Sequence, residues 1–298
     1  MGLERVANIA LEILQNTQSK EAISLYKELE CGKMLRSKLV LSIVENESAY
    51  RLCAIIELIQ SASLLHDDVI DESLLRRGKT SINAKFGNKT AIMLGDILYS
   101  NAFFELSKFD SQIAQSLSQS VSLLSIGELE DVSLEQSFNN NEQKYLDMIT
   151  HKSASLIAAS AECAAILATH ENHRDYYKYG LYLGMAFQII DDILDITQKS
   201  ENLGKPALSD FCSGKTTLPY IYLYHELDND KKAWLKSLFK KNLNTDDFEH
   251  LHSLLLENPI KKAKQKALFY GNFALQIAQK VKNKKLESII NTMIERDF

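Results

Sequence analysis

The sequence is poor in the residues that interrupt helices. It holds three prolines and eleven glycines in 298 residues, which is low for a chain of this length. We also find no clear alternation of apolar and polar residues bounded by hairpin turns, the pattern typical of strands. The sequence therefore predicts an all-α protein, interpreted as a single domain over residues 1–298 with about ten or more helices.

Paired cysteines are absent as well. The four cysteines, Cys31, Cys53, Cys163 and Cys212, lie far apart and form no Cys-x-x-Cys motif. This pattern is unlike that of a structural zinc site or a disulfide framework. We interpret the four residues as free thiols, as expected for a protein of the reducing cytoplasm.

Long hydrophobic runs and a strong charge bias are also missing. The most apolar stretch, residues 154–168, is short and interrupted by Glu162, so no segment is expected to span a bilayer. The N-terminus has no cleavage signal. A net charge of −5 shows no broad basic character, which makes nucleic acid a poor partner candidate.

Two Asp-Asp-x-x-Asp clusters stand out against this background, each at the end of an apolar segment with helical spacing. In a helix, residues four apart lie on one face. Each cluster therefore presents two carboxylates in one direction and a third beside them. The members are Asp67, Asp68 and Asp71 in the first cluster, and Asp191, Asp192 and Asp195 in the second.

Carboxylates gathered on apolar helices repel one another and need a positive partner. Carboxylate oxygens that share substrate phosphates suit Mg²⁺, and the clustered His and Cys that zinc or copper would use are lacking. For one cluster alone, a solvent-facing helix end is as good an explanation as a metal site. Two copies favour a metal cage between facing helices.

Cations beside glycines occur in the turns that flank both clusters. Glycine allows the backbone to approach a phosphate closely, and the neighbouring cation can bind it. A lysine followed by a serine and a glutamine one turn before Asp191 could add donors. The segments are Gly32-Lys33 with Arg36, Arg76-Arg77-Gly78, Lys152-Ser153, Gln188, Gly204-Lys205 and Gly214-Lys215.

As a set, these motifs resemble the trans-isoprenyl diphosphate synthases of the polyprenyl synthetase family, most closely the bacterial long-chain, octaprenyl-type members. The pieces follow the family's order from Gly32 to about Tyr220, and Gly95-Asp96 is a further one. The resemblance implies an isoprenoid synthase-like bundle around a central active-site cavity, usually in a homodimer. It also implies magnesium-dependent, head-to-tail condensation of isopentenyl diphosphate with an allylic prenyl diphosphate.

The resemblance also implies roles for individual residues. About three Mg²⁺ ions are expected with substrate bound, held by Asp67, Asp71 and Asp191, with Asp68, Asp192 and Asp195 in support. Arg76, Lys152 and Lys205 are expected to take part in catalysis with the first three aspartates. The allylic diphosphate is expected to contact Arg76, Lys152, Ser153, Gln188, Lys205 and Lys215, and isopentenyl diphosphate to contact Lys33, Arg36, Gln60 and Arg77.

Three segments depart from the family pattern. The usual Gly-Gly-Lys-Arg-x-Arg-Pro has Cys31, Met34 and Ser37 in place of its first Gly, its middle Arg and its Pro. Gln60 stands where bacterial long-chain members usually have His, and Ser153 stands where Thr is usual. None of these changes removes a metal ligand.

Product length is predicted from two small residues. Ala62 and Ser63 lie one turn before Asp67 and leave room for a growing tail, so we expect a hexaprenyl to octaprenyl or longer product, as in quinone side chains. A bulky residue such as Phe103 or Phe104 would instead close the cavity sooner and give a farnesyl or geranylgeranyl product. His66 is interpreted as a packing residue rather than a general base. By family analogy, the released diphosphate takes the proton.

Other functions remain as alternatives. A terpene cyclase shares the aspartate-rich helices but needs no isopentenyl site, and a non-catalytic subunit would have no need of six intact aspartates. A metal phosphohydrolase would need His ligands before His66, and none precedes it. A plain helical interaction module leaves both clusters unexplained.

The region after about Asp228 carries no recognisable chemistry and is expected to serve packing. From Asn258 onward it is rich in lysine, with apolar residues at Ala267, Phe273, Ile277 and Val281. We interpret the lysines as a solvated helix face.

Overall fold

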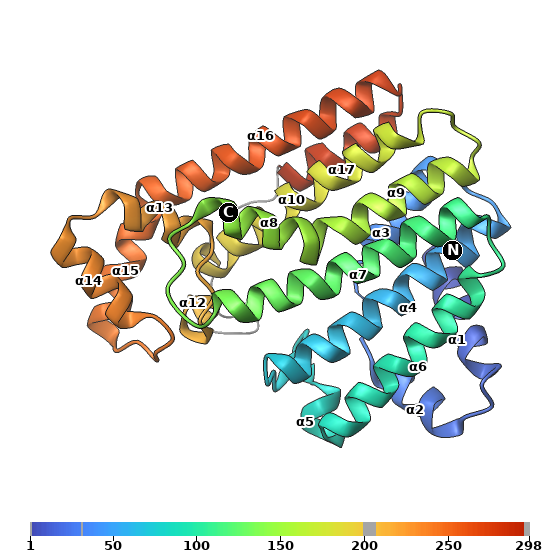
Figure 1. Ribbon diagram of the computed structural model, residues 1–298, viewed down its shortest axis with the longest axis horizontal. Coiled ribbons are helices and arrows are strands. Elements are labelled where there is room, and N and C mark those ends of the chain that lie inside the picture. Colours follow the sequence, from blue (N-terminus) through green and yellow to red (C-terminus); the bar gives the residue numbers. More distant parts are fainter. Residues whose placement is uncertain (1, 31, 199–206, 295–298) are drawn as a thin grey trace. The chain divides into compact units, whose positions relative to one another are not determined.

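The computed structural model describes residues 2–30, 32–198 and 207–294. These residues form helices joined by turns and one small hairpin (Figure 1), which confirms the all-α prediction. The elements are α1 Gly2–Gln15, α2 Lys20–Glu28, α3 Leu35–Ile43, α4 Glu47–Ile70, β1 Leu75–Arg76, β2 Lys79–Thr80, α5 Ile82–Phe86, α6 Asn88–Leu106, α7 Ser111–Leu134, α8 Glu142–Ile149, the π-helix η1 Thr150–Ala154, α9 Ser155–Leu167, α10 His173–Thr197, α12 Ser209–Ser213, α13 Leu218–Glu226, α14 Asn229–Leu238, α15 Thr245–Leu256, α16 Asn258–Lys280 and α17 Lys284–Ile294.

Contacts within the chain divide it into two compact units. The first comprises Met1–Val121 and Ala159–Tyr177, and the second comprises Ser122–Ala158 and Lys178–Phe298. The first aspartate cluster lies in the first unit and the second cluster in the second unit. A single domain over the whole chain stays a prediction.

Helix α4 forms the centre of the first unit. The Asn46 side chain caps its first turn by accepting a hydrogen bond from the Ala49 N–H at 2.8 Å, as expected for an N-cap residue. The helix packs against α1, α3, α5 and α6, and Leu52, Ile55 and Ile59 are fully buried. Each such side chain stabilises the fold by about 1.5–3 kcal/mol, which fixes the helix that carries the first cluster.

A small hairpin that the sequence analysis did not predict follows α4. Leu75 pairs with Thr80 and Arg76 with Lys79 in an antiparallel register. Arg77 and Gly78, between the strands, have φ angles of 53° and 79°. Two positive φ angles in a two-residue loop are typical of a type I′ turn, which favours glycine. The strands are too short to show an alternating pattern.

The second unit is built around α10, α13 and α16. Helix α16 contacts α13, α15 and α17 and buries a face of small residues that includes Ala263, Ala267, Ala274 and Ala278. The Tyr179 hydroxyl, on α10, donates to the Leu286 carbonyl of α17 at 2.8 Å. The region after Asp228 thus takes part in packing, as expected.

The structure bears on two further expectations, the free cysteines and the lack of a membrane-spanning segment. Cys53 and Cys163 are buried free thiols and Cys212 is a half-buried one, whereas Cys31 lies outside the described residues. Within the described ranges, no helix has the length and hydropathy needed to cross a bilayer.

Candidate active site

The first aspartate cluster lies where α4 ends. Asp67 and Asp68 are in the last turn of the helix, and Asp71 is its C-cap residue, with its N–H donating to the Asp67 carbonyl at 2.8 Å. Asp67 is half-buried and Asp71 exposed, whereas Asp68 is only 4% exposed. The three carboxylates therefore meet different environments despite their closeness in sequence.

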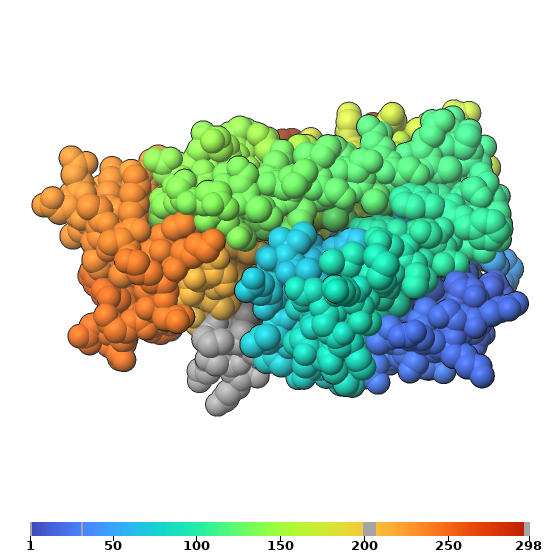
Figure 2. All heavy atoms as spheres, turned by 60° about the horizontal axis from the view of Figure 1, so that its bottom comes forward, coloured from blue at the N-terminus to red at the C-terminus, as the bar shows by residue number. Residues whose placement is uncertain are grey.

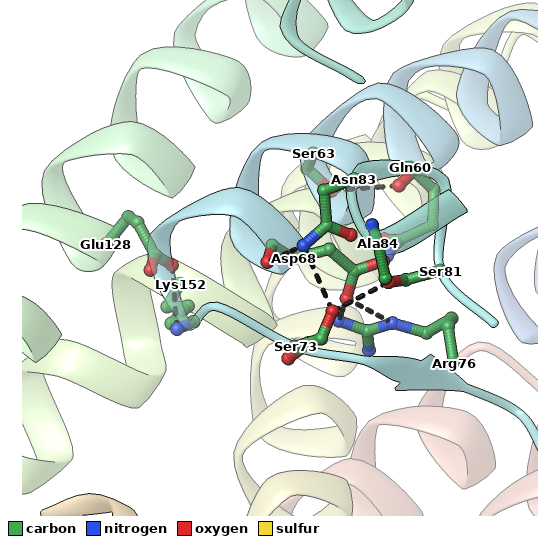
Figure 3. Close-up of polar contacts among 10 residues, drawn as sticks. All are labelled: Gln60, Ser63, Asp68, Ser73, Arg76, Ser81, Asn83, Ala84, Glu128 and Lys152. Atoms are coloured by element: carbon green, nitrogen blue, oxygen red, sulfur yellow. Dashed lines mark hydrogen bonds and ion pairs between the residues drawn. The ribbon is translucent and has the colours of Figure 1, made fainter. Parts of the chain in front are cut away.

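The buried member, Asp68, is held by the hairpin (Figure 3). The Arg76 guanidinium donates from Nε to an Asp68 carboxylate oxygen at 2.8 Å, and its Nη2 contacts the same oxygen. The Asn83 amide donates to the main-chain carbonyls of Asp68 and Ser73 at 2.9 and 3.0 Å. Burial raises the pKa of Asp68 above its ordinary value, and the Arg76 contact opposes this rise. Arg76 is thereby anchored beside the cluster.

A second group of cations in the same unit includes residues expected to bind isopentenyl diphosphate. Burial lowers the pKa of Arg36 to about 10, with Glu57 opposing this shift and the charge of Arg77 adding to it. The Arg77 guanidinium donates to the Glu30 carbonyl and lies so close to Gly32 that a Cβ there would clash with it. The structure therefore brings Arg36 and Arg77 to one place, while Lys33 is exposed at its edge.

Two buried polar atoms near these arginines have no hydrogen-bond partner among the described residues. They are Nε of Arg36 and Oε1 of Gln60. Gln60 follows Glu57 by one turn on α4, and Glu57 is the carboxylate that acts on Arg36. Buried polar groups without partners are rare and call for a ligand or a water.

His66 packs between α4 and α6 as a structural residue. A Cβ at Gly95 would overlap its ring, which explains the glycine of the Gly95-Asp96 pair. The imidazole Nε2 lies 3.3 Å from the Ile92 carbonyl and 3.5 Å from an Asp96 carboxylate oxygen, and the ring contacts Tyr99. These contacts agree with the interpretation of His66 as a packing residue.

The two residues predicted to set product length are buried one turn below the first cluster. Ala62 is fully buried and Ser63 is 4% exposed, with its hydroxyl donating to the Gln60 carbonyl at 2.9 Å. Of the two aromatic residues considered as blocks, Phe103 stacks on Tyr99 with ring centroids 6.2 Å apart, and Phe104 is 64% exposed.

The second cluster shows the same division by burial. Asp191 is exposed, whereas Asp192 and Asp195 are buried. Asp195 accepts hydrogen bonds from the Ser209 hydroxyl at 2.8 Å and from the Asp210 N–H at 3.2 Å. It therefore caps the N-terminus of α12, which continues the chain beyond the cluster.

A hydrogen-bond chain joins Asp192 to residues of α8 and η1. The Tyr145 hydroxyl donates to one Asp192 oxygen at 2.6 Å, and the Gln188 amide donates to the other at 2.9 Å. The Ser153 hydroxyl in turn donates to the Gln188 carbonyl oxygen at 2.6 Å. Burial holds the pKa of Asp192 well above its ordinary value. The chain fixes Ser153 and Gln188, two of the expected diphosphate contacts.

The lysines expected to bind the allylic diphosphate lie against acidic residues of α7. The Lys152 Nζ is 2.7 Å from a Glu128 oxygen and 2.6 Å from an Asp131 oxygen, and Figure 3 shows the Glu128 pair. The Lys215 Nζ is 3.5 Å from the same Asp131 oxygen and 3.8 Å from Glu135. Burial alone would raise the pKa of Asp131, but the two ammonium groups outweigh it and hold that pKa below its ordinary value.

Local backbone structure explains how Lys152 reaches this position. It lies in the π-helix η1, a conformation often found at functional sites. A Cβ at Gly127 would overlap the backbone of Lys152, so glycine lets α7 approach closely there. Lys205 is the one expected diphosphate contact that lies outside the described residues.

The donor atoms of each aspartate cluster are carboxylate oxygens, the kind that a hard divalent cation prefers. No group of three or more His, Cys, Asp and Glu side chains in residues 2–30, 32–198 and 207–294 is arranged to hold a metal ion. The more accessible members of the clusters are Asp67, Asp71 and Asp191, and all their side-chain donors are carboxylate oxygens. Such a set suits Mg²⁺ with water and phosphate oxygens as further ligands.

Sequence reasoning missed Tyr145, Glu128 and Asp131. Each contacts a residue predicted for the site, yet each lies many residues away from it in the chain. One signal was available, because Glu128 and Asp131 are three apart and follow a glycine on an otherwise Ser- and Leu-rich helix. Residues three apart share a helix face.

Comparison with known proteins identifies the family of the chain. The polyprenyl synthetase family matches residues 18–255. The chain is 39% identical over 184 residues to octaprenyl diphosphate synthase of Escherichia coli, a match that covers 61% of this chain and 57% of that protein. It is 29% identical over 306 residues to geranylgeranyl diphosphate synthase of Saccharolobus solfataricus, covering 95% and 92% of the two chains.

A solved structure is similar over nearly its whole length. Octaprenyl pyrophosphate synthase of Helicobacter pylori superposes with a TM-score of 0.94 and 42% sequence identity, covering 99% of each chain. The family match spans well over half of the sequence, and both aspartate clusters and the flanking cations lie within it. The chain therefore belongs to the polyprenyl synthetase family.

Proposed function

We propose that this protein is a magnesium-dependent trans-prenyltransferase that condenses isopentenyl diphosphate with an allylic prenyl diphosphate. The observation that carries the proposal is that the chain has two kinds of candidate diphosphate site. One is a pair of aspartate clusters with accessible carboxylates, and the other is a group of arginines with buried, partnerless polar atoms at Arg36 and Gln60. Elongation needs both kinds, because it joins two diphosphates.

The proposed metal ligands are the accessible carboxylates of Asp67, Asp71 and Asp191. Asp68, Asp192 and Asp195 support them, because their oxygens already bind Arg76, Tyr145 and α12. Mg²⁺, when bound, offsets the charge that develops on the departing diphosphate.

The side chains of this protein have the task of binding and orienting the substrates. Lys152 and Lys215 present ammonium groups to the allylic diphosphate, joined by Ser153, Gln188, Arg76 and Lys205. Lys33, Arg36, Gln60 and Arg77 hold isopentenyl diphosphate. Since ionisation of the allylic carbon–oxygen bond is followed by attack of the double bond, no side-chain nucleophile is required. The departing diphosphate accepts the proton that is lost.

We further propose a long-chain, all-trans product, hexaprenyl to octaprenyl in length. The small buried side chains of Ala62 and Ser63 support this length, as does the similarity to octaprenyl synthases. A geranylgeranyl or shorter product is the alternative, since a geranylgeranyl synthase is similar over 95% of the chain.

We also propose that the protein is a homodimer and that it acts in the cytoplasm. Helix α6, part of the surface turned to the viewer in Figure 2, exposes Ile92, Met93 and Phe104 at 38%, 54% and 64%. Large apolar side chains exposed along one helix are typical of a surface that a partner covers, so a second copy of the chain is the expected cover. The free thiols of Cys53, Cys163 and Cys212 suit a reducing compartment.

The test measures incorporation of labelled isopentenyl diphosphate with Mg²⁺ titrated from zero. Asp67→Asn and Asp191→Asn are compared with Asp246→Asn, a change of an exposed aspartate in the first turn of α15. We expect incorporation only with Mg²⁺, and a loss of about a hundredfold or more in the first two variants. Incorporation without any divalent ion, or equal activity in all three variants, would contradict the proposal.

A further inference from the structure

Helix α16 has a charge distribution unlike that of the whole chain. Between Asn258 and Lys280 it carries five lysines and no acidic residue, and residues 281–285 add three more lysines. The chain as a whole has a net charge of −5. This segment is therefore a concentrated positive region on an otherwise acidic protein.

The outward face of α16 also exposes aromatic rings. Phe269 is 52% exposed and Phe273 is 37% exposed, with Leu268 beside them at 42%. The two phenylalanine rings contact each other at 4.8 Å, and Phe273 contacts Tyr182 of α10 at 5.2 Å. The opposite face is the buried alanine face described above. The rings thus form an exposed apolar patch on the helix whose lysines the sequence analysis interpreted as a solvated face.

Lysines lie at both ends of this patch. Lys262 and Lys280 precede and follow Phe269 by two and three turns and share its side of the helix, and the Lys266 ammonium lies 5.9 Å from the Phe269 and Tyr270 ring centroids. Glu226 lies 2.7 Å from Lys262, Glu142 lies 2.8 Å from Lys266, and Glu287 lies 3.0 Å from Lys284. Because α16 itself holds five lysines and no acidic residue, and residues 281–285 add three more lysines, the segment carries a positive net charge.

We propose that the outward face of α16 docks on a bilayer surface that carries anionic headgroups. Exposed Phe and Leu flanked by lysines match an interfacial helix, in which apolar rings enter the headgroup boundary and long lysine stems reach the phosphates. A second copy of the chain is disfavoured as the partner, because it would bring two positive faces together. Docking goes beyond the proposed reaction, and it would place a synthase of lipid chains at the surface that receives them.

The test is flotation of the full-length protein with vesicles, in the absence of substrates. Vesicles of phosphatidylcholine alone are compared with vesicles that also contain phosphatidylglycerol. The aromatic variant is Phe269→Ser with Phe273→Ser, and the charge variant is Lys262→Gln with Lys280→Gln. A matched control is Phe86→Ser, which removes a 40% exposed ring that lies under Lys85 at 5.1 Å in the other unit.

We expect binding to the anionic vesicles at least tenfold stronger than to the neutral ones. Binding to the anionic vesicles should weaken about tenfold in the aromatic variant and about fivefold per lysine in the charge variant. The control variant should bind as the wild type does. Thermal unfolding of each variant at the wild-type temperature shows that the fold is kept. Absence of wild-type binding, or binding unaffected by loss of both rings, would overturn the inference. Since no substrate is present, that outcome leaves the proposed reaction standing.

Discussion

Asp131 is predicted to hold two phosphate-binding lysines at once, and replacing it should show this. Its carboxylate lies 2.6 Å from Lys152 and 3.5 Å from Lys215, and its side chain is 7% exposed. Asp131→Asn keeps the shape and removes the charge. Both ammonium groups then lose their shared partner within a buried setting.

The expected loss in the free energy of unfolding depends on the ion pairs that Lys152 and Lys215 keep in the variant. Removing one partner of a buried ion pair costs about 3–5 kcal/mol when the other charge is left alone. Lys152 keeps Glu128 at 2.7 Å, and Lys215 keeps Glu135 at 3.8 Å. We therefore expect a smaller loss in the free energy of unfolding, about 1–3 kcal/mol at pH 7. The Michaelis constant for the allylic diphosphate should rise as well, because Lys152 is less firmly placed.

The pH dependence gives a sharper signature. Burial would raise the pKa of Asp131, but the two lysines hold it below its ordinary value. Stability from a depressed carboxyl pKa is present above the unfolded value of about 4 and is lost as the pH falls through the folded value. The difference between wild type and Asp131→Asn should therefore shrink between pH 7 and about pH 3.5.

Urea unfolding at both pH values measures this difference. Glu249→Gln serves as the control, because Glu249 is an exposed carboxylate within α15 of the same unit. We expect the control to change stability by under about 0.5 kcal/mol. An equal destabilisation by Asp131→Asn at pH 7 and pH 3.5 would refute the reasoning, as would no destabilisation at all.

Three further changes test other parts of the site. Gly127→Ala should destabilise the protein by about 1–3 kcal/mol in urea unfolding, because the new methyl overlaps the Lys152 backbone; wild-type stability would contradict this packing. Tyr145→Phe leaves one Asp192 oxygen without its hydroxyl donor and should cost about 1–3 kcal/mol by the same measurement, so an unchanged unfolding midpoint would count against that hydrogen bond. Ala62→Phe should shorten the product in mass analysis of the dephosphorylated alcohols, and unchanged product length would reject the assigned tunnel.

Sequence alone predicted the helical fold and the placement of both aspartate clusters at helix ends. Helix α4 was predictable because apolar residues recur in it at spacings of three and four, and because no proline or glycine interrupts it. The hairpin at Arg76 was missed because each strand has two residues. Its turn signal was the glycine of Arg76-Arg77-Gly78, which was interpreted only as a phosphate-binding feature.

Contacts between residues far apart in the chain could not be predicted from the sequence. Lys152 is predictable as a cation, but its pairing with Glu128 and Asp131 depends on how α7 packs against η1. On α16 the sequence marked Ala267 and Phe273 alike as apolar positions, whereas Ala267 is buried and Phe273 is 37% exposed. Close packing favours small side chains on the buried face of α16, whereas apolar periodicity in the sequence favours large side chains as the candidates for burial.

The central claim is chain elongation, and one incubation tests it most directly. Purified protein is mixed with isopentenyl diphosphate, farnesyl diphosphate and Mg²⁺, and the dephosphorylated alcohols are sized by mass. We predict a ladder of products that ends at hexaprenyl or longer. A stop at farnesyl or geranylgeranyl would keep the reaction and contradict the long-chain product. No elongation with any allylic primer would contradict the account itself.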